Sequence, residues 1–319
     1  MANREISLRG IGSPLDVSLQ WGYDGGHRTG SGLIDVTVPN AARAFDFLYG
    51  GRDNFEVDRQ AATVLVEAAP SIAAAPAAAR DFRRRVVRHL AADAEIGQFL
   101  EVGDGMVSAA NTHEVAQAVD PGCRIVYVES DPMMADRMRA TLASGPGLVA
   151  CVEGDVADVS GIVSAAGLST ARPLDADGSG PPDRIVDPAH GWRPDDGALL
   201  DPARPIAVLL PSTLAHVPSA ADAAKVVAEL MDSAPSGSYL AIHHLASDLD
   251  PALGNAVKRW NAAAAVPIVL RSSAEIAALV TGLDLVDPGL VPVDDWRPDE
   301  SDSPAAAPVP IYGLVARKP

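Results

Sequence analysis

The segment Phe99-Leu-Glu-Val-Gly-Asp-Gly-Met-Val-Ser108 decides the fold. It is an apolar strand pattern that ends in Glu101-x-Gly103-x-Gly105, and a helix pattern starts directly after it. Glycines suit such a turn because the backbone bends sharply and a ligand can approach without meeting a Cβ atom. The N–H groups at the start of the helix would then face the polar end of the ligand. A Gly-x-Gly turn alone is a weak signal, so the neighbouring strands have to support it.

Two further strand ends carry acidic residues at the matching edge of the predicted sheet. The second strand ends at Glu129, where a carboxylate can accept hydrogen bonds from both hydroxyls of a ribose. Asp131 precedes a proline and is expected to cap the next helix, so Glu129 is the better ribose ligand. The third strand leads into Asp155, which is placed for the edge of an adenine ring. Three such ends in register predict a nucleotide site, and Ser108 in place of a third glycine favours S-adenosylmethionine over NAD.

Strands alternate with helices of about a dozen residues, a pattern that predicts a parallel sheet with right-handed crossovers. Strands are expected at 98–102, 124–129, 148–152, 206–210, 238–243 and 312–316, and helices between them at 108–119, 132–142 and 220–233. Three earlier helices are expected near 40–49, 54–70 and 76–94, with Asn40 and Asn54 as N-caps. The predicted organisation is a flexible arm (1–38), a helical cap (39–96) and a Rossmann-like α/β domain (97–319). A stretch rich in Pro, Gly and Asp at about 170–204 is interpreted as an exposed insertion or a functional flap.

Composition excludes several classes of protein. The 319 residues are 48% hydrophobic and 21% charged, as in a globular chain, and no apolar run is long enough to span a membrane. The net charge of −17 argues against a nucleic-acid partner, and the arginines of 80–88 are interpreted as a solvated helix face. Cys123 and Cys151 form neither a disulfide framework nor a metal motif, so no metal is expected. With no leader pattern, the expected location is the cytoplasm.

From about residue 38 to the end, the insertion excepted, the sequence resembles the actinobacterial S-adenosyl methyltransferase family known as DUF574. The resembling motifs are Pro39-Asn-Ala-Ala-Arg-Ala-Phe-Asp-Phe-Leu-Tyr-Gly-Gly-Arg-Asp-Asn-Phe55, 98–117 ending in His113-Glu-Val-Ala-Gln, 125–132, Gly237-Ser-Tyr-Leu240, Leu270-Arg-Ser-Ser-Ala-Glu275 and Pro288-Gly-Leu-Val-Pro-Val-Asp-Asp-Trp-Arg-Pro298. The resemblance implies a seven-stranded class I methyltransferase sheet with a reversed last strand, helices on both faces and a helical N-terminal cap.

Site roles follow from the same resemblance. Glu101, Gly103 and Gly105 would line the methionine end of S-adenosylmethionine, Glu129 the ribose and Asp155 the adenine. In the cap, the residues expected to close over the site are Tyr49, Gly50, Gly51, Asp53 and Asn54. The alternative for this stretch is a helix-ending turn capped by the Asp and Asn side chains.

Two departures from the family pattern bear on the ligand. Asp104 fills the gap where the family has Thr or Ser, and its carboxylate would repel the methionine carboxylate by about 1–4 kcal/mol unless a cation intervenes. That repulsion weakens binding roughly ten- to a thousand-fold. After the fourth strand a histidine has moved to His216 and an aspartate has become Ser219, and after the fifth a Ser-His pair has become His243-His244.

The histidines near the fourth and fifth strand ends are candidates for acid–base work. His243 and His244 are adjacent on a strand and therefore point to opposite faces. We expect His216 or His244 to contribute to the reaction, because a neutral imidazole at the ligand-binding edge can act as a base. His243 is expected to pack against a helix. The plainer interpretation of each is a hydrogen-bonded structural histidine.

These observations predict methyl transfer from S-adenosylmethionine to a small, secondary-metabolite-like molecule, in a chain without a nucleic-acid or membrane partner. One alternative is a repurposed enzyme that cyclises or eliminates a biosynthetic intermediate in the old cofactor cleft, without S-adenosylmethionine. Another is a non-catalytic, partner-binding protein with a vestigial site. The sequence leaves open the acceptor, and whether the chain forms a homodimer or binds a protein partner.

Overall fold

The computed structural model describes residues 36–103, 110–142, 148–168, 198–299 and 308–319. Residues 1–35 of the predicted arm, residues 170–197 of the predicted insertion, and both Asp104 and Gly105 of the glycine turn lie outside these residues. The predicted division into arm, cap and Rossmann-like domain therefore stays a prediction.

The described strands form one sheet in the order β3-β2-β1-β4-β5-β8-β6, with β7 paired to β8. Their bounds are β1 Gln98–Val102, β2 Arg124–Glu129, β3 Val149–Glu153, β4 Ala207–Pro211, β5 Tyr239–Leu245, β6 Asp284–Leu285, β7 Val291–Pro292 and β8 Ile311–Arg317. β1 to β5 are parallel, and β8 runs antiparallel to β5. The expected Rossmann-like sheet with a reversed last strand is confirmed. The sheet has eight described strands, whereas the resemblance implied seven. The two-residue β7, which pairs with β8, is the additional strand.

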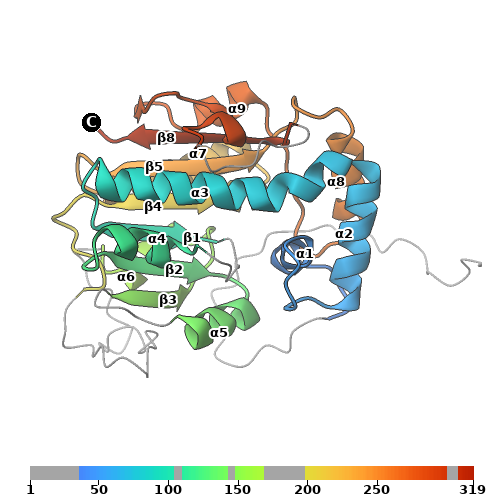
Figure 1. The fold of residues 1–319 in the computed structure, drawn as a ribbon, viewed down its shortest axis with the longest axis horizontal. Coiled ribbons are helices and arrows are strands. Elements are labelled where there is room, and N and C mark those ends of the chain that lie inside the picture. Colours follow the sequence, from blue (N-terminus) through green and yellow to red (C-terminus); the bar gives the residue numbers. More distant parts are fainter. Residues whose placement is uncertain (1–35, 104–109, 143–147, 169–197, 300–307) are drawn as a thin grey trace, which may run out of the picture. The chain divides into compact units, whose positions relative to one another are not determined.

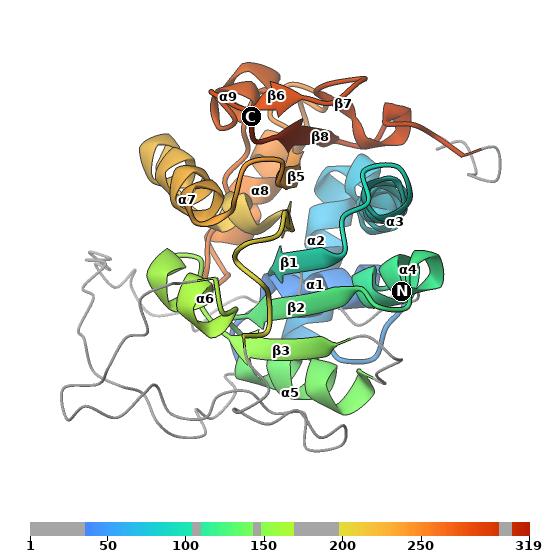
Figure 2. The ribbon, with the colours of Figure 1, turned by 90° about the vertical axis from the view of Figure 1, so that its left-hand side faces the viewer.

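Helices cover both faces of the sheet, as Figure 2 shows. One face carries α3 (Ala75–Ala92), α4 (Thr112–Val119) and α5 (Pro132–Thr141); the other carries α6 (Val159–Ala165) and α7 (Ala220–Ser233). Successive strand side chains point to alternate faces and so divide the core in two. Phe99 and Tyr127 belong to the apolar cluster under α3, whereas Leu100 and Val126 belong to the cluster under α7.

The N-terminal helices lie beyond the carboxyl ends of the parallel strands (Figure 1). They are α1 (Ala41–Leu48) and α2 (Glu56–Ala68), followed by the short helix η1 (Pro70–Ala74) that leads into α3. α2 packs against α8 (Leu253–Asn261). The remaining elements are α9 (Ser273–Ala278), η3 (Thr213–His216) after β4, and η4 (Val293–Asp295), which lies between β7 and β8 in the chain. No described helix has both the length and the apolar character needed to cross a membrane.

Two predicted helix starts are corrected. α2 begins at Glu56 with Phe55, not Asn54, as N-cap residue, because the carboxylate of Asp58 accepts the Phe55 backbone N–H at 2.9 Å. α4 begins at Thr112 rather than at 108, and Asn111 and Glu114 form a capping box at its start.

Candidate active site

The three predicted strand ends lie side by side at one edge of the sheet. Val102 pairs with Val128 and Glu129 with Glu153, so Gly103 stands in the row of Glu129. The Gly103 N–H donates to the Val128 carbonyl at 2.8 Å, and the Gly154 N–H donates to the Glu129 carbonyl at 3.1 Å. The alignment of these strand ends that the sequence predicted is therefore present in the structure.

Gly103 occupies a position that requires glycine. Its φ is +79°, in the left-handed region that side chains disfavour. A Cβ atom there would lie 3.0 Å from the hydroxyl oxygen of Thr213, whose own hydroxyl donates to the Val102 carbonyl. The turn after β1 is thus packed directly against the turn after β4, which leaves bare backbone at the sheet edge.

Glu101 holds elements together at the base of this turn. The residue is 1% exposed, and its carboxylate forms an ion pair with Arg83 of α3 at 2.9 Å and accepts a hydrogen bond from the hydroxyl of Thr112 at the start of α4. Both carboxylate oxygens therefore bind protein groups. These contacts position the turn and the start of α4, and the role of Glu101 at the methionine end stays a prediction.

Glu129 and Asp155 differ in their surroundings. Glu129 is buried, and its Oε1 accepts the backbone N–H groups of Ser130 and Asp131 at 2.8 and 2.9 Å, which fixes the side chain at the end of β2. Asp155 is exposed after β3, where its Oδ1 accepts the Ala157 N–H at 2.9 Å. A fixed carboxylate beside the glycine turn and an exposed one beyond it fit a ribose and an adenine edge.

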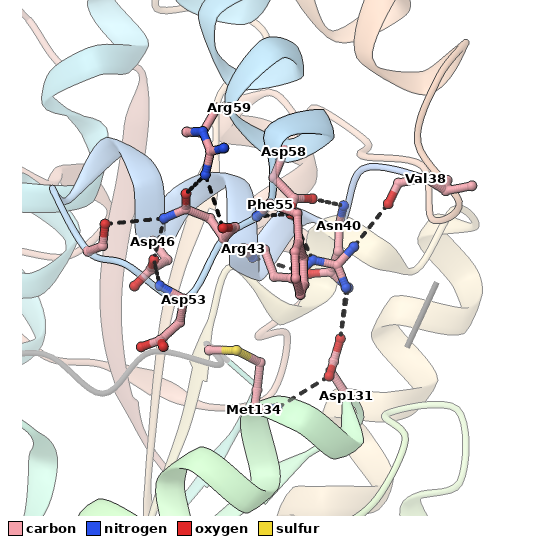
Figure 3. Close-up of polar contacts among 12 residues, drawn as sticks. Val38, Asn40, Arg43, Asp46, Asp53, Phe55, Asp58, Arg59, Asp131 and Met134 are labelled. Carbon is pink, nitrogen blue, oxygen red and sulfur yellow. Dashed lines mark hydrogen bonds and ion pairs between the residues drawn. The ribbon is translucent and has the colours of Figure 1, made fainter. Parts of the chain in front are cut away.

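A buried charge network joins the first cap helix to the start of α5 (Figure 3). Arg43 of α1 forms an ion pair with Asp58 of α2 at 2.9 Å and reaches Asp131, at the start of α5, at 3.7 Å. Asn40 adds a side-chain bond to Asp131 at 3.4 Å, and the Asp131 carboxylate caps α5 through the Met134 N–H at 3.2 Å, as expected for that residue. The first cap helix therefore contacts the loop two residues beyond Glu129.

The turn that follows α1 is built around Asp46. Its Oδ2 accepts the Asp53 backbone N–H at 2.8 Å and the Asn54 amide at 2.7 Å, and a Cβ on Gly51 would lie 2.0 Å from its Oδ1. The Tyr49 hydroxyl donates to the Pro76 carbonyl at the start of α3. Asn54 is thus a residue of this turn, and closure of Tyr49, Gly51, Asp53 and Asn54 over a ligand stays a prediction.

The arginines of α3 do not all lie on a solvated face, contrary to expectation. Arg83 and Arg85 are 5% and 3% exposed, and Arg85 donates to the carbonyls of Trp296 and Val293 at 2.9 and 2.6 Å. Arg84 and Arg88 bind Asp299 nearer the surface. Residues that organise the site but were missed in the sequence are Asp46, Arg43, Asp58 and Arg83. Charged residues on the apolar faces of predicted helices are the signal that would have pointed to Arg43 and Arg83.

The three histidines have separate environments. His243 faces α3, with its ring 6.1 Å from that of Phe82, and burial lowers its pKa to about 3. His244 is fully buried on the other face, where Nδ1 donates to the Leu245 carbonyl and Nε2 accepts from Arg271 at 2.7 Å. The opposite orientation of the pair is confirmed. Both ring nitrogens of His244 are engaged, and this geometry gives no support to its predicted acid–base role.

His216, the last residue of η3, is partly exposed. Its Nδ1 lies 3.3 Å from the Pro267 carbonyl, which can only accept, so the lone pair of the neutral ring is on Nε2. Burial lowers the pKa of His216 and keeps the ring neutral. Its acid–base role stays a prediction. Among the described residues, no group of three or more His, Cys, Asp or Glu side chains is arranged to hold a metal ion.

The strand order, the reversed β8, the glycine turn after β1 and the fixed carboxylate after β2 together define a class I, S-adenosylmethionine-dependent methyltransferase. The family model described as S-adenosyl methyltransferase matches residues 27–178 and 182–319, and the chain belongs to this family. The predictions of family, fold class and enzyme class are confirmed.

Two solved structures support the assignment. A DUF574 family protein from Streptomyces avermitilis is 34% identical with a TM-score of 0.75, covering 89% of this chain and 99% of that one. A candidate methyltransferase from Thermobifida fusca is 32% identical with a TM-score of 0.73, covering 89% of this chain and 96% of that one. Comparison with curated proteins gave no match. Neither the repurposed enzyme nor the non-catalytic protein gains support from these comparisons.

Proposed function

We propose that this methyltransferase transfers the methyl group of S-adenosylmethionine to a small-molecule acceptor that binds between the cap and the carboxyl ends of the strands. The observation that carries the proposal is the docking of α1 through Arg43 and Asp131, directly beside the Glu129 loop. A cap fixed over the strand ends suits a small acceptor better than a long polymer. The net charge of −17 also disfavours nucleic acid and weakly favours a cationic acceptor.

The residues at the sheet edge fit the cofactor by their chemistry. Bare backbone at Gly103 admits the methionine end, the fixed carboxylate of Glu129 accepts the ribose hydroxyls, and Asp155 can accept from the adenine amino group. Bound S-adenosylmethionine supplies an electrophilic methyl group on a sulfonium. The chain contributes proximity and orientation, which account for most of the rate in such displacements. Buried free thiols at Cys123 and Cys151 agree with a cytoplasmic enzyme.

Calorimetry with S-adenosylhomocysteine tests the cofactor half of the proposal. We expect the parent to bind it and Glu129→Ala to bind at least about tenfold more weakly, because the ribose loses its acceptor. Glu153→Ala is the matched control, since Glu153 pairs with Glu129 in the sheet but is exposed and bound to Arg139. Equal affinities in the parent and Glu129→Ala would contradict the site. Replacing Asp104 by Thr should strengthen S-adenosylmethionine binding.

The acceptor half is tested with radiolabelled methyl groups. The enzyme is incubated with labelled S-adenosylmethionine and a cell extract separated into small molecules, proteins and nucleic acids. We expect label in the small-molecule fraction. Label confined to protein or nucleic acid would contradict the proposal.

A further inference from the structure

Ser212 has an unusual backbone conformation at the end of β4. Its φ of 54° and ψ of 0° place a non-glycine residue in the left-handed region, which is uncommon and concentrates at functional sites. The surroundings hold it there, since the Ser212 N–H donates to the His243 carbonyl at 3.0 Å. Ser212 is partly exposed although Pro211 before it and Thr213 after it are buried. The fold thus presents this one side chain at the edge of the sheet.

The Ser212 turn lies beside the proposed methyl donor. Its neighbour Thr213 packs against Gly103, where a Cβ atom would lie 3.0 Å from the Thr213 hydroxyl oxygen. β4 also pairs directly with β1, with Leu209 opposite Glu101. A group at Ser212 is therefore next to the turn assigned to the methionine end, where the reactive methyl group would be placed.

The hydroxyl of Ser212 is oriented by His243. Ser212 Oγ lies 3.1 Å from His243 Nδ1, its one partner among the described residues. The imidazole is buried against Phe82, and burial, together with the charge of Arg83 and the neighbouring His244, lowers its pKa to about 3. The ring is therefore neutral and has one nitrogen lone pair. When that lone pair is on Nδ1, the ring accepts the Ser212 proton and leaves the hydroxyl lone pairs available, and this is the tautomer that the proposal uses.

We propose that Ser212 binds the methyl acceptor by accepting a hydrogen bond from its nucleophilic O–H or N–H group, and that His243 is the positioning residue that orients the Ser212 hydroxyl. The inference rests on the proposed function and specifies the acceptor as a molecule with a hydrogen-bond donor on the atom that is methylated. The acceptor heteroatom forms the new bond to the methyl carbon, and the C–S bond breaks with its electron pair left on sulfur. The displaced proton of the acceptor goes to water, and S-adenosylhomocysteine leaves uncharged at sulfur.

This arrangement gives His243 a role beyond packing. The ring does contact α3, as expected from its place on β5, but its nitrogen also fixes a side chain at the site. With a pKa near 3 it is too weak a base to hold the acceptor's proton, so orientation is the function that its chemistry allows. Selection of the acceptor should therefore depend on both residues together.

Binding of matched fluorinated probes tests the proposal without knowledge of the natural acceptor. Fluorine NMR measures the affinity of the S-adenosylhomocysteine complex for 4-fluorophenol and 4-fluoroanisole, and for 4-fluoroaniline and its N,N-dimethyl derivative. Each pair differs in the donor hydrogen. We expect the parent to prefer the donor-bearing member of at least one pair by about tenfold, as for one well-placed hydrogen bond. Equal affinities in both pairs, or no binding of any probe, would overturn the proposal.

Variants then separate orientation from packing. Ser212→Ala and Ser212→Gly, of which the glycine also relieves the left-handed strain, should abolish the preference. His243→Leu should do the same, whereas His243→Asn should retain it because its amide oxygen can replace Nδ1. Ser233→Ala, which removes a partly buried hydroxyl from α7, is the control. A preference that survives in Ser212→Ala overturns the proposal, and so does equal behaviour of His243→Leu and His243→Asn.

Titration with S-adenosylhomocysteine distinguishes a failure of the proposed function from a failure of the role proposed for Ser212. All variants should bind S-adenosylhomocysteine with the affinity of the parent, because Ser212 and His243 act on the acceptor. Failure of the parent itself to bind S-adenosylhomocysteine would count against the proposed function. Normal cofactor binding with no donor preference would count against the role of Ser212 alone.

Discussion

The guanidinium of Arg83 and the carboxylate of Glu101 form an ion pair 2.9 Å long between α3 and β1, with side chains 5% and 2% exposed. This pair connects α3, the last helix of the predicted cap, to the strand that carries the glycine turn. Thr112 binds the other oxygen of the same carboxylate and so adds the start of α4. Three elements that surround the turn are therefore fixed by one side chain.

Removing one partner of this pair should be costly. Arg83→Met leaves the buried Glu101 carboxylate without its cation, and we expect the free energy of unfolding to fall by about 3–5 kcal/mol. Arg84→Met is the control on the same helix, because its ion pair with Asp299 is more exposed and should contribute about 0–1 kcal/mol. Urea unfolding measures both. Similar losses in the two variants would contradict the buried role of Arg83.

Alanine at Gly103 should affect both stability and ligand binding. The left-handed backbone and the Thr213 contact should together lower stability by about 1–3 kcal/mol and abolish binding of S-adenosylhomocysteine. Gly282→Ala is the control, since its φ is +91° and a Cβ there meets nothing within 4 Å. That variant should show the backbone strain alone and bind normally. Normal cofactor affinity in Gly103→Ala, measured by calorimetry, would mean that the site lies elsewhere.

Alanine variants should separate His216 from His244. His244→Ala removes an acceptor from buried Arg271, which also donates to the carbonyls of Leu214 and Val217, so we expect a stability loss of about 1–3 kcal/mol. His216→Ala should fold normally and, as a lost base, turn over about a hundred- to ten-thousand-fold more slowly. Unfolding curves and single-turnover rates measure the two effects. Wild-type turnover in His216→Ala would leave catalysis to positioning alone.

Mild acid should destabilise the protein through its buried histidines. Burial lowers the pKa of His243 to about 3 and that of His244 to about 4, so between these values and 6.5 the unfolded chain binds more protons. Stability is therefore full above pH 6.5 and falls as the pH drops below it, by about 1.4 kcal/mol for each histidine at pH 5.5. Urea unfolding at pH 7.5 and 5.5 measures the difference. In His243→Asn the stability loss between pH 7.5 and pH 5.5 should be smaller by about the contribution of one histidine. An unchanged loss would contradict the lowered pKa of His243.

Loosening the cap should reveal its docking contact. Asp131→Asn keeps a cap for α5 but removes the charge that faces Arg43, so we expect faster amide hydrogen exchange in α1. Lys225→Ala, which removes an exposed ion pair with Glu229 on α7, is the comparison. Equal exchange in α1 of both variants would show that Asp131 does not hold the cap.

Local patterns predicted much of the sheet edge. The bounds of β1, β2 and α7 match those expected, because apolar runs and caps in these segments are unambiguous. The alignment of Gly103 with Glu129 was predictable, because neighbouring parallel strands end at the same edge of the sheet. The opposite faces of His243 and His244 followed from the two-residue period of a strand.

Contacts that depend on how elements pack were not predictable. The burial of Arg83 and Arg85 depends on which face α3 turns to the sheet, and their neighbours in sequence are equally charged. Asp46 closes a turn through its side chain, so no periodic pattern marks it. Ser212 gained its importance only when its left-handed conformation and the contact with His243 were seen together.

The place of β8 has a consequence for the order of folding during synthesis. Residues 311–317 lie between β5 and β6 in the sheet but follow both in the chain. Until they emerge, the whole length of β5 is an unpaired edge, open to pairing with other chains. We therefore expect nascent chains that have not yet reached β8 to be prone to aggregation and to depend on chaperones, even though all five parallel strands have already been synthesised.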